Sequence, residues 1–297
     1  MFEQLSPQKK AILALIGLIL IWGYNWVVMK VAIRYSSPID YAALRVFLGG
    51  LVLFLVLIFL HKPLLPREIL GTSVTGLLQT SVFYGFSSWA LISGGAGKTA
   101  ILNYAMPFWV LLLAWPLLGE RLQKVQWMGI VAALAGMIFI LMPFQFTETL
   151  FSEGLAILSS ISWAVATTVV KKLQQKTSLD LLSFTTWQML IGSIPLILGA
   201  FLIPSPPIIW SLPFIATLVY SVLLGNAAAW LLWFYVLAHL PAGTAGLGTL
   251  GIPVVAVLSA WAQLGEIPTH AEKIGMALII GALILNSIQA TKSKQQA

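Results

Sequence analysis

Polar and aromatic residues recur at helical spacing in two long apolar segments of this chain. Positions three and four apart share one face of a helix, and in the first segment this face carries Thr80, Tyr84, Ser87 and Leu91. A shift of 146 residues leads to the matching face of a later segment, which carries Asn226, Trp230, Trp233 and Leu237. Hydroxyl, amide and indole groups bind small solutes by hydrogen bonding and stacking. We therefore predict that these two faces contribute to a substrate-binding site.

Other apolar segments add candidates of the same chemical types, namely Trp22, Asn25, Asn103, Tyr104, Trp163, Thr167 and Thr249. Each type has a second interpretation that the sequence leaves open. Trp and Tyr anchor helices at membrane interfaces, an amide can bond a neighbouring helix, and Ser or Thr can bond its own helix backbone. No catalytic or metal-binding residues are predicted. The predicted substrate-binding set is Trp22, Asn25, Thr80, Tyr84, Asn103, Tyr104, Trp163, Thr167, Asn226, Trp230 and Trp233.

Two prolines, Pro107 and Pro253, fall near the middle of predicted helices at equivalent positions. A proline removes one backbone hydrogen bond and kinks a helix, which creates a local bending point. Glycines precede Pro253 and make its helix more adaptable. We predict that the two prolines form a pair of related hinges, with static kinks as the alternative.

The elements that hold these residues are predicted to be membrane-spanning helices. The chain is 59% hydrophobic and 8% charged, with a mean hydropathy of +0.96, whereas a soluble domain is about half apolar and a quarter charged. A span needs about 20 mostly apolar residues. We predict an all-α integral membrane protein with ten spans, near residues 10–33, 39–60, 69–92, 98–118, 124–143, 153–172, 180–203, 211–237, 243–264 and 272–289.

The distribution of Lys and Arg predicts that both termini are cytoplasmic. Eleven of these cations fall on the side of the termini and five on the other side, and Lys and Arg accumulate in cytoplasmic loops. Arg45 is the deepest cation, a few residues into the second span, and we predict that it extends to the outer interface. The net charge of +7 reflects this topology, and nucleic acid is not an expected partner because no basic stripe or RNA motif is present.

The two halves of the chain match in register. The shift of 146 residues superposes Pro107 on Pro253 and two Leu-Gly-Glu motifs on each other, while a shift of 141 pairs Trp22 with Trp163. A repeat of five helices has opposite orientation in its two copies because five is odd. Inverted repeats are typical of alternating-access transporters. The predicted repeats are residues 1–145 and 146–297.

Three short motifs resemble those of a known superfamily. They are the Trp-Gly-Tyr-Asn-Trp sequence at 22–26, the Asn-Tyr-Ala-Met-Pro sequence at 103–107, and the Leu-Gly-Glu sequence at 118–120 and 264–266. All are similar to motifs of the drug/metabolite transporter superfamily. The duplicated five-helix unit resembles the EamA family, and the overall pattern resembles its YddG-type amino-acid exporter branch. The resemblance implies that helices 1, 3, 4, 6, 8 and 9 surround a central cavity, with the others outside.

The sequence lacks the residues and motifs that several classes of function require. The chain has no cysteine, which excludes disulfides and thiol nucleophiles, and no cluster of His, Asp and Glu falls within a span, as an enzyme would need. The glycine-rich segment 94–99 lacks the first glycine and the preceding strand of a phosphate loop. We expect neither an enzyme nor a cofactor nor a metal.

All nine acidic residues fall at or beyond predicted helix ends, where they cannot relay protons within the membrane. We hypothesise a cavity without fixed charge and gradient-driven export of small neutral or zwitterionic metabolites, above all aromatic or a broad range of amino acids. Drug and nucleoside or nucleotide-sugar carriers of the same superfamily are alternatives, and a non-transport membrane bundle is an alternative of another class. We expect a monomer in a bacterial inner membrane, with the lipid bilayer and a small-molecule substrate as partners.

Overall fold

The computed structural model describes residues 7–118, 124–141, 148–239, 249 and 251–295. Its described residues form helices and connecting turns and no strands, which confirms the all-α prediction. The helices are α1 (Pro7–Ala32), α2 (Pro38–Phe59), α3 (Ile69–Thr75), η1 (Gly76–Val82), α4 (Phe83–Ala90), α5 (Ala96–Asn103), α6 (Met106–Leu118), α7 (Lys124–Leu141), α8 (Glu148–Lys176), α9 (Leu181–Leu202), α10 (Leu212–Tyr220), η2 (Ser221–Ala228), α11 (Ala229–His239), α13 (Gly251–Leu264) and α14 (His270–Gln295).

Several of these helices suit a bilayer by length and composition. Five described stretches are long and apolar enough to cross a membrane, namely Lys9–Ala32, Pro38–Phe59, Glu148–Leu173, Leu181–Leu202 and Leu212–Trp233. Large apolar side chains such as Phe59 and Phe201 are more than four-fifths exposed, as lipid-facing residues would be. The protein is therefore a multi-pass membrane protein.

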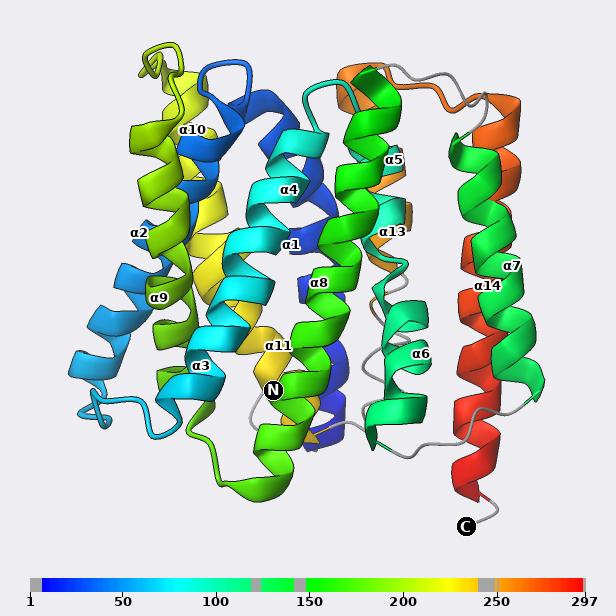
Figure 1. Ribbon diagram of the computed structural model, residues 1–297, viewed down its shortest axis with the longest axis horizontal. Coiled ribbons are helices and arrows are strands. Elements are labelled where there is room, and N and C mark those ends of the chain that lie inside the picture. Colours follow the sequence, from blue (N-terminus) through cyan, green and yellow to red (C-terminus); the bar gives the residue numbers. More distant parts are fainter. Residues whose placement is uncertain (1–6, 119–123, 142–147, 240–248, 250, 296–297) are drawn as a thin grey trace.

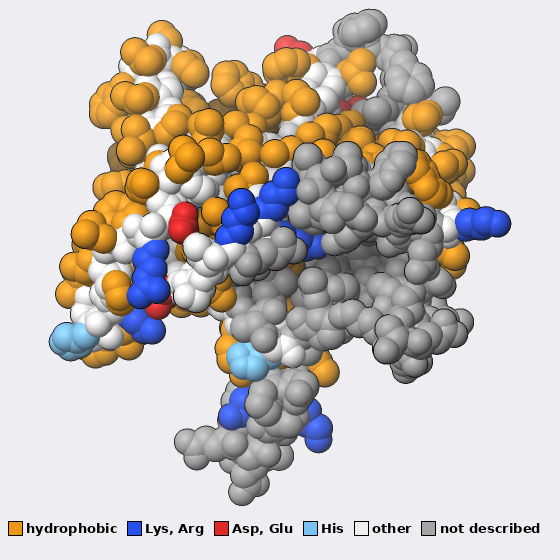
Figure 2. Space-filling model, turned by 60° about the horizontal axis from the view of Figure 1, so that its bottom comes forward, with side chains coloured by type: hydrophobic (Ala, Val, Ile, Leu, Met, Phe, Trp, Pro, Cys, Tyr) orange, Lys and Arg blue, Asp and Glu red, His pale blue; other side chains and the backbone are white. Residues whose placement is uncertain are grey.

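The helices lie roughly parallel, and α1 begins at the same end of the bundle at which α14 finishes (Figure 1). In this view α2 packs against α9 at one side and α7 packs against α14 at the other, with α1, α4, α8 and α13 between them. Figure 2 shows Lys and Arg side chains gathered on the lower face. This end holds the loop with Lys62 and Arg67 and the last turns of α8 with Lys171, Lys172 and Lys176.

Polar caps begin several of the helices at the positions that the sequence provides. The hydroxyl of Ser37 accepts a hydrogen bond from the Asp40 amide at the start of α2, and a proline follows it at the first helical position. The carboxylate of Asp180 accepts from the Ser183 amide at the start of α9. These caps satisfy backbone donors that would otherwise be unpaired at the membrane surface.

Two membrane segments contain a π-helical stretch at equivalent positions. The shift of 146 residues places η1 on η2 to within one residue. A π turn widens the helix and often marks a functional site, and a side chain from a third helix donates to a carbonyl within each one. Ser162 donates to the Leu78 carbonyl (2.8 Å), and the Trp22 indole donates to the Gly225 carbonyl (2.9 Å). We predicted plain helices here because apolar periodicity does not reveal a π turn.

The two prolines lie in the first turns of helices. The predicted span 98–118 divides at Tyr104 and Ala105, and Pro107 is the second residue of α6. Pro253 is the third residue of α13. A first-turn proline removes no hydrogen bond from its helix, so Pro107 marks the start of α6 and does not kink a continuous helix. Most of the predicted span before Pro253 lies outside the described residues.

Candidate functional site

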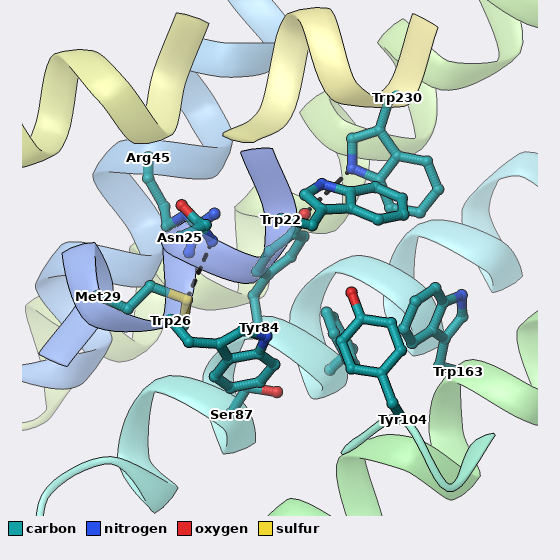
Figure 3. A pocket seen from close by; sticks show the side chains of 11 residues that line it. Trp22, Asn25, Trp26, Met29, Arg45, Tyr84, Ser87, Tyr104, Trp163 and Trp230 are labelled. Atoms are coloured by element: carbon teal, nitrogen blue, oxygen red, sulfur yellow. Dashed lines mark hydrogen bonds between the residues drawn. The ribbon is translucent and has the colours of Figure 1, made fainter. Parts of the chain in front are cut away.

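A small cavity lies among α1, α2, α4, α8 and α11, with a volume of about 30 Å³ (Figure 3). This space suits water and is far smaller than a typical ligand pocket of several hundred Å³. The cavity must therefore widen before a ligand larger than water can enter. Its lining residues are Trp22, Asn25, Trp26, Met29, Arg45, Phe83, Tyr84, Ser87, Tyr104, Trp163 and Trp230.

Trp22 is the centre of the aromatic cluster around this cavity. Its ring packs edge-on against Trp163 (centroids 6.2 Å apart) and Trp230 (5.4 Å), and in a tilted arrangement against Trp233 (6.2 Å). Trp163 also packs against Tyr104 at 5.7 Å. Edge-to-face pairs are the favoured aromatic geometry. The structure thus brings Trp22 and Trp163, which the repeat register pairs, into direct contact.

A hydrogen-bond relay connects the predicted faces of the two repeats. The Trp230 indole donates to the Tyr84 hydroxyl (3.1 Å), and this hydroxyl donates to the Asn226 Oδ1 atom (3.0 Å). The Asn226 amide in turn donates to the Arg45 backbone carbonyl (2.7 Å). Gly49 makes room for Asn226, because an added Cβ there would lie 2.8 Å from the Asn226 Cβ atom. Asn226 therefore bonds two lining residues, Tyr84 and Arg45, but does not itself line the cavity.

Arg45 lies inside the protein, which corrects three predictions. Its side chain is fully buried and lines the cavity, so it does not extend to the outer interface. Its Nη2 atom is 3.4 Å from the Asn226 Oδ1 atom, and its guanidinium lies over the rings of Tyr84 (4.8 Å) and Tyr41 (5.5 Å). Two aromatic faces and an amide oxygen favour the inward position over the interface. The cavity therefore contains a fixed positive charge, and helix 2 contributes to it.

A second polar chain joins α2, η2 and α1 beside Arg45. The hydroxyls of Tyr41 and Ser221 are hydrogen-bonded to each other, and Ser221 donates to the Asn25 Oδ1 atom (3.3 Å). The Asn25 amide donates to the Met29 sulfur at 3.3 Å, as Figure 3 shows. These contacts place Asn25 in the cavity wall next to the guanidinium.

The other predicted residues lie outside the cavity lining. Asn103 is buried in a network between helices, where it accepts from Ser87 (3.0 Å) and Ser159 and donates to the Thr99 carbonyl (2.9 Å). Its packing role was the alternative that the sequence left open. The hydroxyl of Thr167 bonds the backbone carbonyl of its own helix.

Thr80 and Thr249 are buried but line no part of the cavity. Trp233 does not line the cavity either, but its ring packs against Trp22, which does.

The upper end of the bundle, predicted to face outside, is tied together above the cavity. The Lys98 ammonium group pairs with Glu153 (2.8 Å) and Glu272 (2.5 Å), which joins α5, α8 and α14. The Lys30 ammonium group donates to the carbonyls of Leu91 and Gly94, which joins α1 to the loop after α4. These contacts hold the helices together at that end.

Two long segments of the chain, residues 9–142 and 150–288, match the model of the EamA-like transporter family. The chain belongs to this family. This membership confirms the resemblance on which the superfamily prediction depended, and it agrees with an apolar, all-helical protein. Each match covers one of the segments predicted to be a repeat.

Curated relatives of this EamA-like protein are transporters by name. The uncharacterized transporter YoaV of Bacillus subtilis is 30% identical over 96% of this chain and 99% of the relative. A probable amino-acid metabolite efflux pump of Salmonella typhimurium is 27% identical over 94% of this chain and 95% of the relative. A crystal structure, described no further, matches with a TM-score of 0.69 at 18% identity and covers 96% of this chain, which supports the fold.

Four lining residues of this EamA-like protein were not predicted, namely Trp26, Met29, Arg45 and Phe83. Trp26 and Met29 follow Trp22 at helical spacing and could have been found by extending that face. Arg45 gave a stronger signal, because a cation within an apolar span is costly and usually functional. Phe83 had no distinguishing signal in a chain with many aromatic residues.

Proposed function

We propose that this protein exports small neutral or zwitterionic metabolites, amino acids foremost, across a bacterial inner membrane. The observation that carries the proposal is the cavity lined by aromatic side chains and the Asn25 amide within a transporter-family fold. The name of the Salmonella relative, a probable amino-acid metabolite efflux pump, supports the substrate class. The protein acts as a monomer in the lipid bilayer and uses no cofactor.

We further propose ten spans arranged as two inverted repeats, residues 1–145 and 146–297. The packing of the helices supports this arrangement. α1 packs against α11 and α13, and the equivalent helix α8 packs against α4 and α6. Likewise α2 packs against η2 and α9 packs against η1. Two equivalent sets of contacts allow the halves to exchange conformations, which is the basis of alternating access.

Transport by purified protein in liposomes tests this function. We expect uptake of labelled amino acids and little uptake of nucleosides or quaternary amines. Trp163→Ala and Trp230→Ala should each lower the rate at least tenfold, because each removes aromatic contacts from the cavity wall. Trp261→Ala is the matched control, since Trp261 is 57% exposed on the outer surface of α13. Normal transport by both cavity variants would refute the site, and preferred nucleoside uptake would favour the alternative substrate class.

The hinge hypothesis gives a separate prediction for Pro107 and Pro253. With alanine at position 107, a new N–H could bond the Asn103 carbonyl and join α5 to α6 across the break at Tyr104. We expect Pro107→Ala and Pro253→Ala to fold normally and to transport several-fold more slowly at saturating substrate. Pro213→Ala, at an exposed first-turn position of α10, is the control. Two unchanged rates would show that the prolines are not hinges.

A further inference from the structure

Arg45 has unused hydrogen-bonding capacity in a buried site. The side chain is 0% exposed, and its Nε and Nη1 atoms have no hydrogen-bond partner among the described residues. Its one polar side-chain contact is the long one from Nη2 to Asn226. A buried guanidinium with unfilled donors is energetically costly unless an oxygen-bearing partner completes it.

No carboxylate within the described part of the chain provides that partner. The ion pairs found there join Lys62 with Asp180, and Lys98 with Glu153 and Glu272, all away from Arg45. The rings of Tyr41 and Tyr84 stabilise the charge through their faces, but they leave the in-plane N–H groups free. The positive charge is therefore only partly compensated.

The guanidinium retains one complete pair of parallel donors. Nη2 has two N–H groups, and it directs one of them to Asn226. The second N–H of Nη2 is parallel to an N–H of the neighbouring nitrogen, which is Nε if Asn226 lies on the Nη1 side and Nη1 if Asn226 lies on the Nε side. Both of these nitrogens lack a hydrogen-bond partner among the described residues. Such a pair of donors matches the two oxygens of a carboxylate. Figure 3 shows Arg45 next to Asn25, with Tyr104 and Trp163 at the opposite end of the pocket.

We propose that Arg45 binds the carboxylate of the transported solute, while the aromatic end of the cavity holds the rest of the molecule. This inference rests on the proposed function and changes its substrate class to solutes that carry a carboxylate, which are zwitterionic amino acids or, beyond the proposed set, anionic monocarboxylates. A single cation lines the cavity, which suits one carboxylate better than a doubly charged phosphate. Positively charged drugs are disfavoured because they would approach a cation that is only partly compensated.

The wild-type protein alone tests the proposal through its tryptophan fluorescence, because four tryptophans line the cavity. We expect L-phenylalanine and 3-phenylpropionate to bind, and L-phenylalaninamide and phenethylamine to bind at least tenfold more weakly. The two acids distinguish a zwitterion from a simple monocarboxylate. Equal binding of acid and amide, no binding of either acid, or stronger binding of phenyl phosphate would overturn the carboxylate site.

Variants then assign the effect to Arg45. Arg45→Gln should weaken binding of the acid roughly 10- to 100-fold and abolish discrimination against the amide, because a charged hydrogen bond contributes about 1.5–3 kcal/mol. Arg45→Lys should restore part of the discrimination by restoring the charge. Arg34→Gln is the control, since Arg34 is exposed at the end of α1. Unaltered discrimination in folded Arg45→Gln would overturn the assignment, and if that variant does not fold, full wild-type affinity in Arg45→Lys would do so.

The outcomes separate this inference from the proposed function. Acid-selective binding that depends on Arg45, without any transport into liposomes, would support the carboxylate site and reject export. Equal transport of phenylalanine and its amide would support a transporter and reject the carboxylate site.

Discussion

Replacing Gly192 with valine should destabilise the protein by about 3 kcal/mol, at the upper end of the usual cost of overpacking. Gly192 in α9 lies against η1, where an added Cβ would meet the Gly76 carbonyl and lie 2.5 Å from the Thr80 Cβ atom. Gly76 has the reciprocal constraint, with an added Cβ 2.6 Å from the Gln188 carbonyl. These obstacles are mostly backbone atoms, which cannot rotate away as a side-chain end could. The two helices would have to separate.

Reversible unfolding in mixed detergent micelles would measure this loss. Gly154→Val is the matched control, because no atom lies within 4 Å of an added Cβ at that position in α8. We expect the control to stay within about 1 kcal/mol of wild type, as substitutions at unobstructed positions do. Equal stability of the two variants would show that α9 and η1 are not packed as closely as described.

Replacing Lys98 with methionine should open the upper end of the bundle. Glu153 and Glu272 would lose their shared cation, and their side chains are only 5% and 14% exposed. Removing one partner of a buried ion pair costs about 3–5 kcal/mol, and 1.4 kcal/mol is a tenfold change in an equilibrium. Since Lys98 is itself partly exposed, we expect the population open at this end to rise roughly tenfold or more.

Thiol labelling can measure this opening because the chain has no native cysteine. A Ser87→Cys reporter in the cavity should react with a membrane-impermeant maleimide, added outside, roughly tenfold faster when Lys98→Met is also present. Lys62→Met is the matched control, because its ion pair with Asp180 is 49% and 31% exposed and exposed pairs contribute little. Equal labelling in the two double variants would show that Lys98 does not close this end.

Several features followed from the sequence because they depend on local composition or spacing. Apolar length and charge content were enough to predict a helical membrane protein. The stripe containing Tyr84 was predicted from helical periodicity and its match containing Trp230 from the shift of 146 residues, and the structure places both residues in the cavity lining. The repeat register predicted that Trp22 and Trp163 are equivalent, and the two rings are in contact.

Other features depended on which helix each residue meets. A cation four residues from Tyr41 has the same sequence signature whether it extends to the interface or turns inward. The rings of Tyr41 and Tyr84 and the amide of Asn226, from three different elements, decide the inward position of Arg45. Periodicity likewise cannot distinguish an α turn from a π turn, because both keep an apolar face.

The sequence by itself thus determined that the chain is helical and lies in a membrane, because a bilayer imposes length and polarity on each span separately. It also predicted an internal repeat and the residue types that face inward. Only the tertiary structure decided which inward residues share the cavity and which pair between helices. Asn103 and Asn226 are both amides within apolar segments. Asn103 accepts a hydrogen bond from Ser87 in the packing between helices, whereas Asn226 accepts one from the Arg45 guanidinium. The physical reason is that a buried polar group takes its role from its partners, and those partners come from distant parts of the chain.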